Sequence, residues 1–337
     1  MVRPGARYHG DRTAGPGMLD FAVNVRSTAP PEWLQQRLAG RLKDLGHYPA
    51  ESQVSAAVDT VARRHGVHSD QVLLLAGGAE GFALLPELGP QLAALLAPSF
   101  TEPEATLAAA GIAIEQVPVP SPFRLTDARF PDAADLVVLG NPTNPTGVLH
   151  SRDDVLALRR PGRMLIVDEA FADSLPGEPE SLATLGLADV VVLRSLTKTW
   201  ALAGLRVGYA LGDPSVLARL AARRAHWPLG TLQLEAITAC CSPSAVAEAA
   251  VGARRLQALR TEMTDALTGL GLSVVPGCAP FVLVKVPEPT LLRQHLWSRN
   301  IAVRRCDTFI GLGEDYLRLA VRPEWPILVE AIKEMLR

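Results

Sequence analysis

Arg194-Ser-Leu-Thr-Lys-Thr-Trp-Ala-Leu-Ala-Gly-Leu-Arg-Val-Gly-Tyr209 is the stretch of the chain that decides the fold. It directly follows Val190-Val-Val-Leu193, a β-branched run that predicts a buried strand. Lys198 then lies just past the carboxyl end of that strand, where open α/β sheets place their ligands. An amine among apolar neighbours, or beside a second cation such as Arg206, has a lowered pKa and becomes a usable nucleophile towards an aldehyde. We therefore predict that Lys198 is the reactive group.

Composition places the chain among globular proteins that act on small molecules. Its 337 residues, 48% of them hydrophobic, suffice for two domains or one large one. The 33 Lys and Arg nearly balance the 35 Asp and Glu, so nothing favours nucleic acid or an anionic membrane as a partner. The four cysteines form neither a C-x-x-C metal pattern nor a secreted disulfide framework. Because an apolar leader and a long apolar run are both missing, we expect a cytoplasmic protein without a metal site.

Short apolar runs alternate with helical stretches from residue 71 onward, which predicts a mostly parallel sheet between helices. The runs are 72–75, 92–97, 113–117, 136–139, 164–167, 190–193 and 207–211. Earlier, 19–23 could form a strand, and 33–45 and 54–65 have helical periods. After residue 214 we expect helices at 244–270, 290–299 and 325–336 and strands at 281–286, 302–305 and 316–321. The prediction is an α/β fold, with a large domain at 46–240 and a smaller α+β domain formed by 1–45 and 241–337.

The segment Ser195-Leu-Thr-Lys198, followed by Arg206, resembles the lysine segment of the fold-type I pyridoxal-phosphate enzymes, the aspartate-aminotransferase-like proteins. The resemblance implies that Lys198 binds pyridoxal phosphate and that Ser195 and Arg206 hold its phosphate, the arginine by a bidentate contact. Thr197 is also expected among the cofactor-binding residues. Taken alone, S-x-x-K also fits a surface turn or an unrelated acylating enzyme, so other motifs have to decide.

Two further strand ends carry residues that suit this cofactor. Asn141-Pro-Thr-Asn-Pro-Thr-Gly147 resembles the Asn-Pro-Thr-Gly loop of the superfamily, which implies that Asn144 bonds the ring 3-oxygen; an ordinary turn is the alternative. Asp168 ends the apolar run 164–167, where its burial is costly without a partner. The proposed partner is the pyridine nitrogen, which an ionised Asp168 keeps protonated so that the ring serves as an electron sink. A helix cap is the alternative for Asp168.

Gly77-Gly-Ala-Glu-Gly81 lies between a predicted strand and a predicted helix. Backbone N–H groups at such a position bind phosphate, and glycine lets the chain approach closely. The stretch is not a G-x-G-x-x-G fingerprint, so a nicotinamide cofactor is disfavoured. By resemblance, Gly78, Ala79 and Glu80 cradle the phosphate. Phe100 falls where the family stacks an aromatic ring on the pyridine, although a core phenylalanine is an equal alternative.

Other elements of the resemblance concern the substrate and a second subunit. Tyr48 resembles a tyrosine that reaches the cofactor phosphate of the neighbouring subunit, which implies a homodimer with shared active sites; a buried tyrosine in a turn is the alternative. Arg318 and Arg322 lie on one face of a predicted strand. The resemblance makes Arg318 the clamp for the substrate α-carboxylate and Arg322 a candidate for a second anion, such as a phosphate. His9 and Asn24 resemble parts of an arm that closes over the substrate.

Phe171 points to one branch of the superfamily. The common aminotransferase pattern has a tyrosine three residues after the aspartate, and here the hydroxyl is missing. Asp168-Glu-Ala-Phe171, with the segments at 194–198 and 204–209, resembles the cobalamin-pathway branch of L-threonine-O-3-phosphate decarboxylases, which also resemble histidinol-phosphate aminotransferases. Arg304 matches this branch without an assigned role. The chain departs from the branch at 24–29, 227–230 and 279–281, all near the substrate side, which puts the substrate in doubt.

These observations predict a pyridoxal-phosphate enzyme that acts on a phosphorylated amino acid or amine. Decarboxylation of L-threonine-O-3-phosphate is the first expectation. Transamination of the histidinol-phosphate type, with glutamate and 2-oxoglutarate, is the alternative, because the same residues serve both reactions. A cofactor-binding protein without turnover is a third possibility, motivated by the three departures and opposed by the joint presence of Lys198, Asp168 and Arg318.

Overall fold

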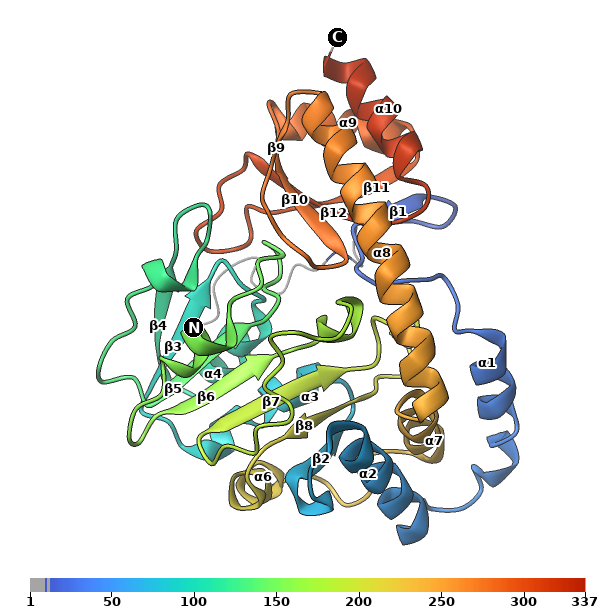
Figure 1. Ribbon diagram of the computed structural model, residues 1–337, viewed down its shortest axis with the longest axis vertical. Coiled ribbons are helices and arrows are strands. Elements are labelled where there is room, and N and C mark those ends of the chain that lie inside the picture. Colours follow the sequence, from blue (N-terminus) through green and yellow to red (C-terminus); the bar gives the residue numbers. More distant parts are fainter. Residues whose placement is uncertain (1–9, 11–12, 337) are drawn as a thin grey trace.

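The computed structural model describes Gly10 and residues 13–336, which fold around two β-sheets (Figure 1). Figure 1 shows the larger sheet in the lower half of the molecule and the smaller one above it. The long helix α8 (Pro243–Gly269) runs along one side from the larger sheet to the smaller one. The predicted α/β architecture is confirmed, and the space where the two sheets approach one another holds the candidate site.

Seven strands form the larger sheet in the order β2-β8-β7-β6-β5-β3-β4. Strands β3 to β7 pair in parallel, whereas β8 runs antiparallel to both β2 and β7. The strand bounds are Val72–Leu75 (β2), Leu92–Ala97 (β3), Ala113–Pro118 (β4), Leu136–Gly140 (β5), Met164–Asp168 (β6), Val190–Ser195 (β7) and Gly208–Leu211 (β8). Every apolar run predicted in this region is a strand, so the predicted mostly parallel sheet is confirmed.

Helices cover both faces of this sheet because successive strand residues point to opposite sides. In β7, Val190 and Val192 belong to one core and Val191 and Leu193 to the other. The first core includes residues of α1 (Glu32–Ala39), α2 (Glu51–His65), α5 (Arg152–Leu156) and α7 (Thr231–Cys240). The second includes residues of α3 (Gly78–Ala83), α4 (Glu102–Ala109) and α6 (Pro214–Ala221). Two buried faces explain why these strands are apolar throughout.

The single helix expected at 33–45 is divided at Gly40. Helix α1 ends at Ala39, and a 3-10 turn follows at Leu42–Asp44. Glycine has the lowest helix propensity apart from proline, so the break falls there. Leu34 of α1 packs into the first core of the larger sheet, whereas the predicted division assigned residues 1–45 to the small domain. The domain division remains a prediction.

Five strands form the smaller sheet in the order β1-β11-β12-β10-β9. Their bounds are Leu19–Phe21 (β1), Ser273–Val274 (β9), Phe281–Lys285 (β10), Ile301–Arg305 (β11) and Tyr316–Ala320 (β12). Strand β1 pairs in parallel with β11, and the other pairs are antiparallel. Helices α8, α9 (Pro289–Ser298) and α10 (Trp325–Leu336) share a separate core with it. The N-terminal segment thus lies on the same sheet as Arg304 and Arg318.

Helix α8 begins after Ser242, whose hydroxyl accepts a hydrogen bond from the Ala245 N–H, as expected of an N-cap. Within the described residues, no single helix has the length and apolar character needed to cross a membrane. Helices α7 and α8 meet that test only as a pair, on length and composition, and a 67° bend separates them.

Candidate functional site

A cavity of about 460 Å³ lies at the carboxyl ends of the central strands of the larger sheet, and β11 and β12 contribute to its opposite wall. Its volume is in the range of small-molecule sites. Eight of the residues predicted to act at the site line it: Asn24, Ala79, Phe100, Asn144, Asp168, Lys198, Arg206 and Arg318. Residues that lie far apart in the sequence are therefore brought together around one cavity.

Parallel pairing explains why three of these residues meet. Gly140 at the end of β5 pairs with Asp168 at the end of β6, and Asp168 pairs with Leu193 in β7. Asn144 and Lys198 follow β5 and β7 within a few residues. Because the carboxyl ends of parallel strands lie at one edge of a sheet, the order of the motifs in the sequence becomes a side-by-side arrangement in space.

The Asp168 carboxylate faces the cavity but is surrounded by protein. Burial raises its pKa to about 6, and the Ala170 N–H and the Lys198 amine only partly oppose this rise. The Ala170 N–H donates to Asp168 Oδ1 over 3.0 Å. A cation placed opposite Asp168 would stabilise its ionised form, which is the interaction that a protonated pyridine nitrogen offers.

Asn144 and Arg318 are joined across the cavity. Arg318 Nη1 donates to Asn144 Oδ1 over 2.6 Å, and Nη2 donates to the Ala22 carbonyl over 2.5 Å. Burial lowers the pKa of Arg318 to about 9, so it remains a cation at neutral pH. Since the amide oxygen serves Arg318, Asn144 can serve a ligand oxygen through its NH₂ group.

The residues predicted to hold a phosphate lie together at the end of the larger sheet. Gly77 has a φ of 84°, and a Cβ built there would lie 3.0 Å from Arg206 Nη2, so glycine makes room for the guanidinium. A Cβ on Gly78 would lie 3.9 Å from the Ser195 Cβ. Ser195 Oγ and Thr197 Oγ1 are 2.7 Å apart and share a hydrogen bond. The start of α3 thus lies beside the Arg206 guanidinium and Ser195, and these groups are of the kind that donate hydrogen bonds to a phosphate.

Glu80 has a supporting place in this group. Its carboxylate accepts hydrogen bonds from the Ala76 N–H over 2.6 Å and from Arg224 Nη2 over 2.9 Å, and its own N–H donates to the Gly77 carbonyl over 3.1 Å. These bonds hold the turn before α3. Gly78 and Glu80 are not among the residues that line the cavity, whereas Ala79 is.

Phe100 and Phe171 are two of the three phenylalanines that line the cavity, and Phe309 is the third. Phe100 lies after β3 and packs against Phe82, with ring centroids 6.1 Å apart. Phe171 is buried and meets the Phe281 ring edge to face at 5.1 Å. Neither carries a hydroxyl, so Asn144 is the residue of the predicted set that can donate a hydrogen bond to a ring oxygen on this side.

Residues of the N-terminal segment form another part of the wall. Asn24 is buried, lines the cavity, and its Oδ1 has no hydrogen-bond partner within the described part of the chain. Such an atom is costly to bury and fits a ligand that donates to it. Arg322 Nη2 donates to the Val23 carbonyl over 3.1 Å, so Arg322 holds this segment and does not line the cavity. His9 lies outside the described residues.

Tyr48 lies apart from the cavity. Its side chain is 74% exposed and stacks on Trp227, which is itself 50% exposed, with ring centroids 4.2 Å apart. Tyr48 is not among the residues that line the cavity. The predicted role therefore depends on a second subunit.

Arg304 is the cavity residue to which the sequence gave no role. It pairs in register with Arg318 across β11 and β12, and both are buried, at 3% and 5% exposure. Arg304 Nη2 donates to Thr308 Oγ1 over 2.8 Å, and its guanidinium lies 5.1 Å from the centre of the Phe309 ring. Both arginines line the cavity, and guanidinium groups are suited to bind an anion there. The sequence signal that could have pointed to Arg304 is a charged residue inside an otherwise apolar strand.

A buried ion cluster supports the loop between β6 and β7. Arg194, at 1% exposure, donates to Glu169 Oε2 over 3.0 Å and also pairs with Asp173. Arg64 of α2 donates to Asp173 Oδ1 over 2.8 Å. Glu169 and Arg194 are the direct chain neighbours of Asp168 and Ser195, so the cluster fixes two site residues from behind.

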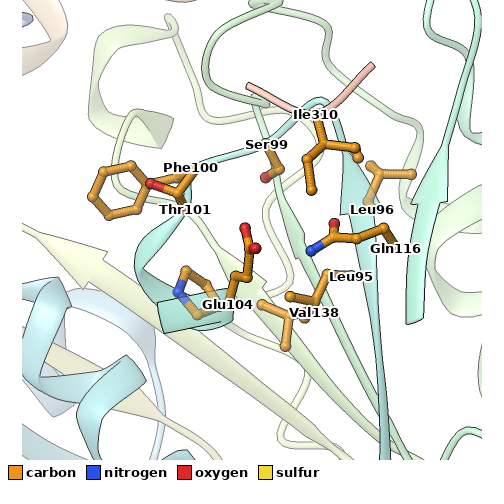
Figure 2. A pocket seen from close by; sticks show the side chains of 11 residues that line it. Leu95, Leu96, Ser99, Phe100, Thr101, Glu104, Gln116, Val138 and Ile310 are labelled. Carbon is orange, nitrogen blue, oxygen red and sulfur yellow. The ribbon is translucent and has the colours of Figure 1, made fainter. Parts of the chain in front are cut away.

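A second, much smaller cavity is lined in part by Phe100, as Figure 2 shows. It measures about 20 Å³ and is lined by Glu104, Gln116 and Ser99 among apolar side chains. That volume holds about one water molecule and no cofactor. The larger cavity is thus the candidate site.

Comparison with known structures defines the class of fold. The histidinol-phosphate aminotransferase of Clostridium acetobutylicum superposes with a TM-score of 0.86 at 21% identity, covering 95% of this chain and 99% of that one. The L-threonine-O-3-phosphate decarboxylase of Porphyromonas gingivalis gives 0.82 at 23% identity, covering 94% and 98%. The protein therefore has the fold of the fold-type I pyridoxal-phosphate enzymes.

The family follows from the sequence comparisons. The family model "Aminotransferase class I and II" matches residues 16–332. A histidinol-phosphate aminotransferase of Mycobacterium tuberculosis is 62% identical over 98% of this chain and 90% of its own length. The threonine-phosphate decarboxylase of Salmonella typhimurium is 30% identical over 90% of this chain and 87% of its own. The chain belongs to the class I and II aminotransferase family, and its cofactor is pyridoxal phosphate.

Proposed function

We propose that this protein is an aminotransferase that moves an amino group between histidinol phosphate, or a closely similar amino phosphate, and 2-oxoglutarate. The observation that carries the proposal is the 62% identity, over 98% of the chain, to a protein named histidinol-phosphate aminotransferase. The relative named for decarboxylation, which was the first expectation from the sequence, is 30% identical. The comparisons thus support transamination, the alternative expectation, better than decarboxylation.

The described residues fit the cofactor at three points. Asp168, whose burial calls for a cation, receives the pyridine nitrogen. Asn144, whose amide oxygen serves Arg318, offers its NH₂ group to the ring 3-oxygen. Ser195, Thr197 and Arg206 receive the phosphate, with Gly78 and Ala79 at the start of α3, and Phe100 stacks on the ring. Bound in this way, the cofactor supplies an electron sink for charge that develops at the substrate α-carbon.

Lys198 has two tasks in the proposed reaction. It binds the cofactor covalently at rest, and once the substrate amine has replaced it, its Nζ takes the proton from the substrate α-carbon. The ionised carboxylate of Asp168 would stabilise the positive charge on the ring nitrogen and so keep that nitrogen protonated during this step. Return of that proton by Lys198 to the cofactor carbon that bore the aldehyde would complete a transamination, whereas loss of a carboxylate from the α-carbon would be a decarboxylation.

Arg304 and Arg318 receive the anionic end of the substrate. An aminotransferase of this type binds two substrates in turn, and one carries a phosphate where the other carries a carboxylate. A pair of guanidinium groups can accept either anion through bidentate bonds. Asn24 Oδ1 is positioned in the same wall to accept a hydrogen bond from the substrate. Arg322, the earlier candidate for a second anion, positions the segment that carries Asn24.

Decarboxylation of L-threonine-O-3-phosphate is the second candidate, and Phe171 is the observation that favours it. A hydroxyl at this position is the common aminotransferase pattern, and the Phe171 ring is buried against Phe281 instead. If Arg318 held the α-carboxylate perpendicular to the cofactor ring, the bond between that carboxylate and the α-carbon would break, carbon dioxide would leave, and Lys198 would supply a proton to the α-carbon. Histidinol phosphate has no α-carboxylate, so the two candidates are chemically distinct.

We also propose a cytoplasmic homodimer in which Tyr48 reaches the phosphate group of the partner's cofactor. Its exposed stack with Trp227 supports this proposal, because a large aromatic pair on a surface is a common element of an interface. Nothing in the charge balance favours nucleic acid or a membrane as a partner.

Two assays on the purified, cofactor-loaded protein test the proposed reaction. Histidinol phosphate with 2-oxoglutarate should yield glutamate without carbon dioxide, and Lys198→Ala should yield neither. Release of carbon dioxide from L-threonine-O-3-phosphate, independent of 2-oxoglutarate, would replace the proposal by the second candidate. A protein that holds the cofactor and catalyses neither reaction would instead be a binding protein.

A further inference from the structure

The segment that follows Asn24 is tied directly to the turn that carries Lys198. The Arg26 N–H donates a hydrogen bond to the Lys198 carbonyl over 3.0 Å. This is a contact between the N-terminal segment and the predicted reactive residue itself. It lies within 24–29, where the sequence departs from the pattern of the branch that it resembles.

The Arg26 side chain lies in a slot on α8. A Cβ built on Gly252 would overlap the guanidinium, and the three atoms nearest to that Cβ all belong to Arg26. Glycine within a long helix lowers helix stability relative to alanine, so its presence at 252 needs a reason. The space it leaves for Arg26 supplies that reason. Glu248 lies one turn before Gly252 and attracts the guanidinium, while Arg255, one turn after, repels it.

A second link joins the same helix to the Lys198 turn. Glu248 Oε2 accepts a hydrogen bond from Trp33 Nε1 over 2.9 Å. Trp33 packs edge to face on Trp200, with ring centroids 5.5 Å apart. Trp200 is two residues beyond Lys198. One short patch of α8 thus holds the turn through two separate routes, by way of Arg26 and by way of Trp33.

We propose that Arg26 is a positioning residue for Lys198, and that Gly252 of α8 is the slot that accepts it. The backbone of Arg26 fixes the Lys198 carbonyl, and the guanidinium anchors that backbone to α8. The proposal rests on the proposed role of Lys198. It adds that Arg26 holds the turn that carries Lys198 in a fixed position relative to α8. A longer side chain at 252, or a shorter one at 26, loosens the turn without touching the cavity.

Gly252→Ala gives the sharpest test because it should displace Arg26 while favouring the helix. We expect the dissociation constant for pyridoxal phosphate, measured by titration of the apoprotein, to rise about tenfold in Gly252→Ala and in Arg26→Ala. We also expect the pH at which the bound cofactor changes its visible spectrum to shift in both variants. Thermal unfolding of the apoprotein should be unchanged or shifted upward in Gly252→Ala. The double variant should bind pyridoxal phosphate as tightly as either single variant, since both substitutions remove the same contact.

Arg254→Ala is the matched control, because Arg254 is an exposed arginine on the same helix. It should leave the dissociation constant and the spectrum unchanged. Wild-type affinity and an unshifted spectrum in Gly252→Ala would overturn the proposal, as would additive effects in the double variant. Borohydride reduction followed by peptide mapping shows separately whether Lys198 holds the cofactor. Labelling at Lys198 with unaffected variants would therefore overturn the positioning role alone.

Discussion

Arg304 and Arg318 face one another across β11 and β12, and both contribute to the wall of one cavity. Burial has the largest effect on the pKa of the Arg318 guanidinium, Arg304 repels this guanidinium, and Asp20 attracts it. Two buried guanidinium groups in one cavity wall are suited to bind an anionic ligand. This relationship links the smaller sheet to the chemistry at the edge of the larger one.

Arg304→Met should separate binding from stability. We expect the KM for the phosphorylated substrate to rise about 10- to 100-fold, because one charged hydrogen-bonding group is lost, while the cofactor spectrum remains unchanged. The apoprotein should keep most of its thermal stability, because methionine replaces the buried aliphatic stem of the arginine. Steady-state kinetics and thermal unfolding check these outcomes. An unchanged KM would show that Arg304 does not contact the substrate.

Asp168 gives a prediction about pH. Its carboxyl ionises near 4 in the unfolded chain and at about 6 in the folded apoprotein, so the folded state retains the proton more strongly. The apoprotein should therefore lose stability as the pH rises from about 4 to 6, by up to roughly 3 kcal/mol from this group. Asp168→Asn should remove this component. Urea unfolding at several pH values measures it, and identical pH profiles for the two proteins would contradict the assignment.

Saturating cofactor should reverse the effect of Asp168 above pH 6. A protonated pyridine nitrogen favours the ionised carboxylate, so the holoprotein should gain stability over the apoprotein. In Asp168→Asn the gain should be smaller. Equal gains in the two proteins would mean that the ring nitrogen does not meet this carboxylate.

The buried cluster around Arg194 should contribute strongly to the stability of the fold. Arg194→Met leaves Glu169 and Asp173 with one cation fewer, and a broken buried pair costs about 3–5 kcal/mol. Urea unfolding should show a loss of that size. Arg159→Met is the control, because Arg159 pairs with Asp189 at the surface, where loss of an ion pair should have little effect on stability. Equal losses in the two variants would contradict the role given to burial.

Tyr48 tests the proposed dimer. A Tyr48→Ala variant should lose cofactor from both sites, and a Lys198→Ala variant should be inactive for a different reason. Mixing the two should restore activity, because one site of the mixed dimer combines an intact Lys198 with an intact Tyr48 from the other subunit. Activity of the mixture is compared with that of each variant alone. No restoration, with mixed dimers demonstrated by native mass spectrometry, would count against a shared site.

The sequence predicted the larger sheet closely because strands with two buried faces are continuous apolar runs. Val190 and Val191 each pack into a different core, so neighbouring residues of one short segment are both apolar. It also predicted the positions of Asn144, Asp168 and Lys198, since polar residues at the ends of such strands stand out. The break at Gly40, which divides the helix expected at 33–45, was not predicted.

Long-range relationships were beyond the reach of the sequence. The pairing of Arg304 with Arg318 depends on the register of two antiparallel strands, and a register is not written in local patterns. The fit of Arg26 against Gly252 joins residues more than two hundred positions apart. Arg322 was predicted to contact the substrate, but its guanidinium donates to the Val23 carbonyl. That contact also joins residues that only the fold brings together.

The central claim is that Lys198 holds the cofactor, and borohydride reduction followed by peptide mapping tests it most directly. The chain has four lysines, Lys43, Lys198, Lys285 and Lys333, so the label has few possible positions. We predict one reduced cofactor per chain, on the peptide that contains Lys198, and loss of the visible absorbance in Lys198→Ala. A label on Lys43, Lys285 or Lys333, with the absorbance of Lys198→Ala intact, would contradict the account.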